Sequence, residues 1–171
     1  MIESKKFLEL LNRAGYNFEV CNHKAFFTVE DSYKFRGKIN GAHSKNLFLK
    51  NKKGDFFLIS CEESTNINIK KMSKSLGLGN LSFAKEEYLA SMLGIKPGSV
   101  TPFALLNNIE NNINFYLEDK LYNADYINFH PLTNTATVTI KSADFIEFMI
   151  ENNKKIHIFS SQEEVIIKTY E

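Results

Sequence analysis

The chain has no tryptophan, only three prolines and two cysteines, and no excess of charge of either sign. Its 21 basic residues stand against 20 acidic residues, so no global field draws it to nucleic acid. Any contact with RNA must come from a local patch. Cys21 and Cys61 stand outside any Cys-x-x-Cys motif, which predicts reduced thiols in a cytosolic protein rather than a disulfide.

Several motifs with defined chemistry are also missing. The sequence contains no P-loop, and Gly77 and Gly79 lack the third glycine of a dinucleotide-binding turn. The four histidines have no metal-ligand spacing, so we expect neither a metal nor a cofactor. No apolar run is long enough for a signal peptide or a membrane span. We therefore expect a cytoplasmic protein that does not contact membranes.

What the sequence does contain is enough apolar material for a sizeable core. Hydrophobic residues make up 43% of its 171 residues and include 15 phenylalanines, which predicts one domain over residues 1–171. Interleaved helical and strand patterns with local hairpins indicate an α/β (α+β) fold, a mixed, largely antiparallel sheet flanked by helices. We expect helices over 4–14, 29–35, 68–76, 85–93 and 143–152, with Ser142 capping the last. We expect strands over 16–20, 46–50, 56–60, 81–83, 113–117, 126–130, 136–140 and 156–159, the last in the chain.

Lys45 directly precedes a strongly apolar strand pattern. Alternation sends Asn46 and Phe48 to one face of that strand and Leu47 and Leu49 to the other. A lysine at the mouth of such a strand can extend its ammonium into a cleft, where it pairs with a phosphate or polarises a carbonyl. Taken alone, the pattern fits an ordinary solvated lysine better.

The segment Gly98–Pro102 is a stiff loop between two prolines. Gly98 lets a ligand approach the backbone, while Pro97 and Pro102 fix the path of the chain. Exposed backbone N–H groups and the hydroxyls of Ser99 and Thr101 can hold a sugar hydroxyl or an acyl carbonyl. A plain connector explains the loop equally well when it is considered alone.

His130 ends a strand, and Pro131 stops the ladder, which predicts an imidazole at the edge of the sheet or the rim of a pocket. It can act as a general base, as a hydrogen-bonding group or as a steric wall, and a purely structural histidine is the competing interpretation. No second residue is spaced to complete a nucleophilic triad. A modest phosphate-binding rim or a solvated face is predicted by a further set of lysines: Lys50, Lys52, Lys53, Lys70, Lys71 and Lys74.

Taken in order, these segments resemble one known family. The segments that carry the resemblance are Phe27–Glu30, Gly41–Lys50, Leu58–Ser60, Leu81–Phe83, Leu93–Phe103 and Asn128–Thr137. Together they are similar to the YbaK-type aminoacyl-tRNA deacylases, and most similar to the free-standing prolyl-tRNA editing proteins that remove alanine from tRNA(Pro). The resemblance extends from about His23 to about Phe159, which is most of the chain.

The resemblance implies a function and a set of site residues. The essential lysine of the family falls on Lys45, its Gly-x-x-x-Pro loop on Gly98, Ser99, Val100, Thr101 and Pro102, and its pocket histidine on His130. The implied reaction is metal-free hydrolysis of the ester of a mischarged tRNA, most simply alanyl-tRNA(Pro). We place Asn46 with the loop and His130 as substrate-binding residues, and Lys50 as a tRNA-binding residue. The implied partners are a tRNA acceptor end carrying a small amino acid and, as a further candidate, prolyl-tRNA synthetase.

Two alternatives stay open. The same fold can serve as a non-catalytic module that senses an amino acid or aminoacyl-tRNA and is linked to proline metabolism. A sibling deacylase that removes cysteine or serine from another tRNA would differ only in the shape of its pocket. The presence of Lys45 and of the complete Gly98–Pro102 loop favours catalysis over sensing.

Overall fold

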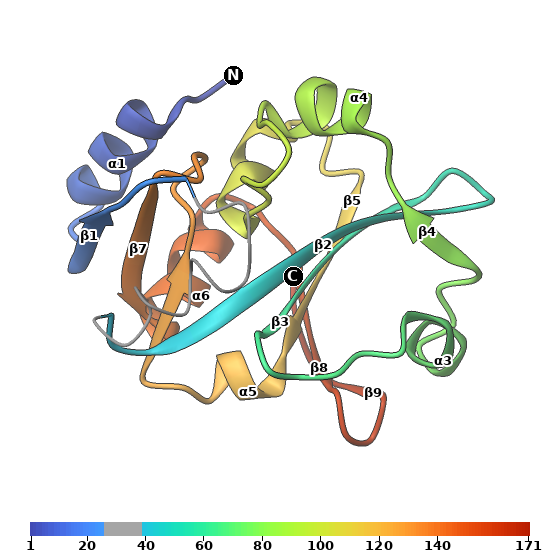
Figure 1. The fold of residues 1–171 in the computed structure, drawn as a ribbon. Helices are drawn as coiled ribbons and strands as arrows, with labels where there is room; N and C mark the ends of the chain where they lie inside the picture. Colours follow the sequence, from blue (N-terminus) through green and yellow to red (C-terminus); the bar gives the residue numbers. More distant parts are fainter. Residues whose placement is uncertain (26–38) are drawn as a thin grey trace.

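A computed structural model describes residues 1–25 and 39–171 of the chain. Its centre is one twisted sheet of nine strands within these residues, in the order β1-β7-β6-β2-β3-β5-β8-β9, with β4 paired to β2 (Figure 1). The strands are β1 (Phe18–Asn22), β2 (Ala42–Asn51), β3 (Phe56–Glu62), β4 (Leu81–Phe83), β5 (Ile113–Glu118), β6 (Tyr126–Phe129), β7 (Ala136–Lys141), β8 (Ile156–Ser160) and β9 (Val165–Tyr170).

Helices of several kinds pack around this sheet. The α-helices are α1 (Ser4–Arg13), α3 (Ile69–Ser75), α4 (Glu86–Tyr88), α5 (Asp119–Tyr122) and α6 (Ser142–Glu151). A π-helical turn, η1 (Leu89–Leu93), continues α4, and a 3₁₀ helix, η2 (Pro102–Asn107), precedes β5. In the described part of the chain, no helix has the length and apolar character needed to cross a membrane.

The sheet is mixed but mostly antiparallel. Local hairpins join β2 to β3, β6 to β7 and β8 to β9, and β1 adds to β7 in the antiparallel sense. Parallel pairing occurs where β2 meets β6, where β3 meets β5 and where β5 meets β8. The long strand β2, which crosses the middle of the molecule in Figure 1, therefore links an antiparallel half to a mixed half. The predicted fold class is confirmed.

One face of the sheet carries the main hydrophobic core. Phe103 of η2 lies at its centre, with ring centroids 4.5 Å from Phe7 of α1, 5.6 Å from Phe145 of α6 and 5.8 Å from Phe129 of β6. All four rings are almost completely buried. Because each such aromatic side chain removes a large apolar area from water, this cluster fixes α1, α6 and η2 on the same face of the sheet.

The opposite face carries a second, smaller cluster under α3. Leu49 of β2, Ile59 and Cys61 of β3 and Phe159 of β8 pack there with Met72 of α3. Neighbouring Phe48 lies in the main core instead. The alternation predicted for the apolar strand after Lys45 is therefore confirmed, and consecutive residues of β2 serve the two faces in turn.

Most expected elements exist at or near their predicted positions. The first helix, the hairpin between β2 and β3 and the short strand β4 are all present. Asn68 caps α3, its side-chain oxygen accepting a bond of 3.0 Å from the amide of Lys71. The helix predicted over residues 29–35 lies outside the described residues.

Several expectations were wrong in detail. Lys45 does not stand at the mouth of its strand, because β2 already begins at Ala42. Ser142 does not cap α6; it is the first helical residue, and its hydroxyl donates to the carbonyl of Leu121 over 3.0 Å. The strand over 156–159 is not the last, since β9 follows it. Neither α5 nor η2 was predicted from the sequence.

Candidate functional site

Lys45 projects from the middle of β2, directly across from Cys61 of β3. Its side chain is half-buried, and its ammonium donates hydrogen bonds to two backbone carbonyls, that of Glu63 over 3.1 Å and that of Thr65. Both carbonyls belong to the turn that follows β3. The ammonium therefore has a defined position in which a short stretch of backbone supplies its acceptors.

The pairing of β2 with β6 sets Lys45 relative to His130. His43 lies opposite Asn128 in this parallel pair, and Lys45 and His130 stand two positions further along in the same direction. On β6, Ile127 and Phe129 point into the main core, so Asn128 and His130 take the other face by alternation. Lys45 shares that face. Leu49 is four residues further along β2, on the same side of the strand as Lys45, and it lies in the second cluster, whereas Phe48 lies in the main core.

The half of this face near β6 and β7 is polar rather than apolar. Buried Thr139 donates to Oδ1 of Asn128 over 2.6 Å, and Nδ2 of Asn128 donates to the carbonyl of Asn40 over 2.8 Å. Thr137 lies on the same side of β7 and contacts Nε2 of His23 at 2.9 Å. Buried polar groups need partners, and these residues supply them to one another. The result is a polar surface on the sheet beside the half-buried His130.

His130 is held in one tautomer by its surroundings. Its Nδ1 lies 2.8 Å from the carbonyl oxygen of Ala136, which can only accept, so Nδ1 carries the proton. Burial lowers the pKa of His130, and the neighbouring His23 lowers it further, although the bond to Ala136 acts in the opposite direction. The ring is therefore neutral at physiological pH, and its Nε2 carries a lone pair that can accept a hydrogen bond.

His23 lies beside His130, with ring centroids 6.1 Å apart. Its Nδ1 is 2.9 Å from the carbonyl oxygen of Lys24, so that nitrogen donates and Nε2 accepts from the hydroxyl of Thr137. No role in a site was predicted for His23 from the sequence. No sequence signal marks it, because its partner Thr137 is more than a hundred residues away and meets it only through the β1–β7 pair.

The Gly98–Pro102 loop lies next to the connection that follows His130. Gly98 has a φ of +83°, and a Cβ on it would lie 3.4 Å from Nδ2 of Asn134, so the backbone of the loop approaches the β6–β7 connection closely. Ser99 and Thr101 are buried rather than displayed to solvent. The hydroxyl oxygen of Thr101 has no hydrogen-bond partner among the described residues.

The two remaining predicted residues lie on the other face of β2. Asn46 accepts a hydrogen bond of 2.6 Å from Ser60. Lys50 extends its ammonium to the hydroxyl of Tyr88 at 3.2 Å, and its Nζ lies 4.7 Å from the centroid of that ring and 5.1 Å from that of Phe56. The structure thus places Lys45 and His130 on one face and the Gly98 loop beside the β6–β7 connection that follows His130. It places Asn46 and Lys50 on the other face of β2.

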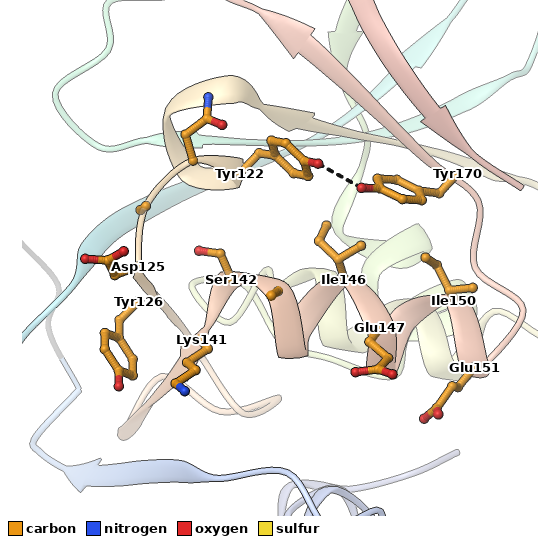
Figure 2. A pocket seen from close by; sticks show the side chains of 13 residues that line it. Tyr122, Asp125, Tyr126, Lys141, Ser142, Ile146, Glu147, Ile150, Glu151 and Tyr170 are labelled. Carbon is orange, nitrogen blue, oxygen red and sulfur yellow. Dashed lines mark hydrogen bonds between the residues drawn. The ribbon is translucent and has the colours of Figure 1, made fainter.

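A separate cleft of about 1010 Å³ lies between α5, α6 and β9. Figure 2 shows its walls, with the hydroxyls of Tyr122 and Tyr170 in a hydrogen bond of 2.8 Å and Glu147 and Glu151 on α6. The hydrogen bond from Tyr170, more than the nearby Lys168, lowers the pKa of Tyr122. None of the residues predicted for the site lines this cleft. Among residues 1–25 and 39–171, no group of three or more histidine, cysteine, aspartate or glutamate side chains is arranged to hold a metal ion.

Comparison with known proteins identifies the family. The sequence model of the aminoacyl-tRNA editing domain matches residues 23–148. The chain is 34% identical over 149 residues to prolyl-tRNA synthetase associated domain-containing protein 1 of Danio rerio, covering 86% of this chain and 81% of the relative. It is 28% identical over 144 residues to the prolyl-tRNA editing protein ProX of Acetoanaerobium sticklandii, covering 84% and 87%.

Solved structures agree on the fold. A protein described provisionally as a trans-editing enzyme for prolyl-tRNA synthetase superposes with a TM-score of 0.66 at 18% identity, over 91% of this chain and 96% of that one. At this identity the likeness concerns the fold alone. The match to the family over residues 23–148 also covers β2, which carries Lys45, and β6, which ends one residue before His130. The chain belongs to the aminoacyl-tRNA editing domain family.

Proposed function

We propose that the chain is a deacylase that acts on mischarged tRNA. It hydrolyses the ester between a small, wrongly attached amino acid and the 3′ end of the tRNA, with alanyl-tRNA(Pro) as its substrate. Membership of the editing-domain family supports the reaction type, and the names of the relatives from Danio rerio and Acetoanaerobium sticklandii support the prolyl system. The observation that carries the proposal is the placement of the Lys45 ammonium and the neutral His130 imidazole on one face of the sheet.

In this proposal Lys45 supplies positive charge. An ammonium has three N–H donors, and two of them are directed at the carbonyls of Glu63 and Thr65. The third is then available for the terminal phosphate or for the ester carbonyl, where negative charge develops as water attacks. Because an aminoacyl ester is already activated, positioning and charge stabilisation are sufficient without a protein nucleophile.

The reaction needs no component beyond substrate and water. Water adds to the ester carbonyl carbon, the bond from that carbon to the ribose oxygen breaks, and the ribose oxygen takes a proton. The products are the free amino acid and uncharged tRNA. The vicinal ribose hydroxyl of the tRNA assists the attacking water in this scheme, and the Gly98–Pro102 backbone holds the adenosine.

His130 has a recognition role in the proposal. Its unprotonated Nε2 accepts a hydrogen bond from the α-ammonium of the amino acid, which a protonated imidazole would repel. A pocket with a rigid wall rejects larger amino acids by steric clash, whereas a preference for one extra methylene contributes only about 1–3 kcal/mol. An editing pocket for alanine is therefore expected to be small.

The test is a deacylation assay on alanyl-tRNA(Pro) with wild type, Lys45→Ala and Lys85→Ala. We expect Lys45→Ala to lower the rate about 100- to 1000-fold, the loss typical of removing one group that stabilises developing charge. Lys85→Ala is the matched control, because this lysine is exposed and its ammonium lies 3.9 Å from the carboxylate of Glu87, outside the proposed site. Equal rates for wild type and Lys45→Ala would exclude the proposed chemistry.

A panel of other substrates separates the alternatives. Faster hydrolysis of cysteine or serine esters on another tRNA than of alanyl-tRNA(Pro) would identify a sibling deacylase. Tight binding of charged tRNA without ester loss would identify a sensing module. Addition of prolyl-tRNA synthetase to the assay tests that partner, since a complex is expected to change the apparent affinity for the charged tRNA.

A further inference from the structure

Glu118, the last residue of β5, is a completely buried carboxylate that the proposed chemistry does not use. A charge in such a place is costly unless several donors surround it. The amide of Glu62 donates to its Oε2 over 2.6 Å, and the hydroxyl of Thr65 donates at 2.9 Å to Oε1. The hydroxyl of Ser161 donates as well, and the ammonium of Lys120 lies 3.9 Å from Oε1.

Two of these donors belong to the turn that follows β3. Glu62 opens the turn and Thr65 closes it, with the amide of Thr65 donating to the carbonyl of Glu62 over 3.1 Å. The carboxylate of Glu118 therefore bonds to the turn at both ends. Lys120 strengthens this arrangement, because its Nζ donates to the hydroxyl oxygen of Thr65 over 2.9 Å.

The carbonyls of the same turn hold Lys45. The ammonium of Lys45 donates to the carbonyl of Glu63 and to the carbonyl of Thr65. One residue, Thr65, thus connects the two charges: its hydroxyl bonds to the carboxylate and its carbonyl accepts from the ammonium. The side chains of Glu118 and Lys45 need no direct contact for this coupling, because the turn connects them.

We propose that Glu118 is a positioning residue that fixes the 62–65 turn so that its carbonyls hold the Lys45 ammonium in place. The inference rests on the proposed function in so far as Lys45 acts on substrate, but the positioning itself is independent of activity. A charge that stabilises a transition state must be set before the reaction, and an error of about 1 Å can cost about a hundredfold in rate.

Thr65→Val is the sharpest variant for the test. It removes the hydroxyl that links Glu118 to the turn and keeps the backbone carbonyl that accepts from Lys45. Ser142→Ala is the matched control, because it also removes a buried hydroxyl, one that donates to the carbonyl of Leu121 in a different part of the fold. Glu118→Gln is a second test variant that keeps the shape of the side chain and removes its charge.

The first measurement is NMR of the side-chain Nζ groups in protein labelled with ¹⁵N-lysine, with Lys45→Arg used to assign the Lys45 signal. We expect the Lys45 signal to move in Thr65→Val and in Glu118→Gln and to stay in place in Ser142→Ala. An unchanged Lys45 signal in a folded Thr65→Val protein overturns the inference. This measurement does not require the chain to be a deacylase.

The second measurement is the deacylation rate in a double-mutant cycle. We expect Thr65→Val to lower kcat by about tenfold with little change in KM in the wild-type background and to have no further effect in Lys45→Ala. A purely structural role would give the same fold-change in both backgrounds and would overturn the inference. An inactive wild type would remove the proposed function only, since the NMR result then still decides whether Glu118 positions Lys45.

Discussion

Thr139 of β7 and Asn128 of β6 form a buried side-chain hydrogen bond of 2.6 Å on the face that carries His130. The amide of Asn128 also donates to the carbonyls of Asn40 and Ala42, at 2.8 and 3.4 Å. The side chain of Asn128 thus connects β6, which ends just before His130, to the segment that leads into β2. These hydrogen bonds stabilise the pairing of β6 with β2, the strand that carries Lys45.

Asn128→Asp is expected to destabilise the protein by about 2–3 kcal/mol. The change replaces a donor by a carboxylate oxygen that would face the carbonyl of Asn40 without a hydrogen. The free energy of unfolding in urea at pH 7 measures this loss. Thr139→Val is the control, because it removes the hydroxyl and keeps both amide donors, so its cost is expected to be smaller, about 1 kcal/mol. Equal costs would contradict the assignment of the amide nitrogen of Asn128 to the Asn40 carbonyl.

His130 is expected to make stability depend on pH on the acid side of neutrality. Burial holds its pKa in the folded protein below the value of the unfolded chain, about 6.5. As the pH falls below that value, the unfolded state binds the proton first, so the free energy of unfolding decreases. Urea unfolding at pH 7.5 and pH 5.0 measures the decrease, which we expect to be smaller in His130→Asn.

His157 also contributes to the pH dependence of stability, so its substitution is the control for His130→Asn. Burial also lowers the pKa of His157, with a smaller contribution from Lys155. His157→Asn is therefore expected to reduce the same pH dependence separately, and the double variant to reduce it most. If His130→Asn kept the full pH dependence of the wild type, the neutral state assigned to His130 would be wrong.

Local patterns predicted the elements that position the site. The alternation around Phe48 could be predicted because apolar residues of β2 lie on both faces of the strand. Asn68 marked the start of α3 because its side chain caps the helix. These features depend on residues close together in the sequence, and the sequence therefore carries them.

The missed features depend on distant contacts. Glu118 is followed by Asp119 and Lys120, a charged run that is typical of a solvated turn, and only the packing of β5 between β3 and β8 buries its carboxylate. The strand β9 shows no alternation, because it lies at the edge of the sheet with nearly all its residues exposed. The partners of His23 likewise come together only through the β1–β7 pair.

Gly41 is expected to tolerate alanine much less well than Gly54 does. The two glycines have similar positive φ values, +93° and +97°, so a side chain costs each of them about 1 kcal/mol of backbone strain. A Cβ on Gly41 would also lie 2.7 Å from the carbonyl oxygen of Tyr126, whereas one on Gly54 meets nothing within 4 Å. We expect Gly41→Ala to lose about 2 kcal/mol more than Gly54→Ala in urea unfolding. Similar losses would mean that β2 and β6 separate easily at this point.

The two cysteines are expected to differ sharply in their reaction with iodoacetamide at pH 8. Cys61 is completely buried, and burial, together with the carboxylate of Glu118, raises the pKa of its thiol well above the usual range. Because the thiolate is the nucleophile, Cys61 should remain unmodified in the folded protein while the partly exposed Cys21 is alkylated. Mass spectrometry of the digested protein measures both sites, and the same reaction in urea, where both should be modified, is the control. Alkylation of Cys61 at the rate of Cys21 under native conditions would show that the cluster beneath α3 opens readily, and that the turn holding Lys45 is less firmly fixed than its hydrogen bonds indicate.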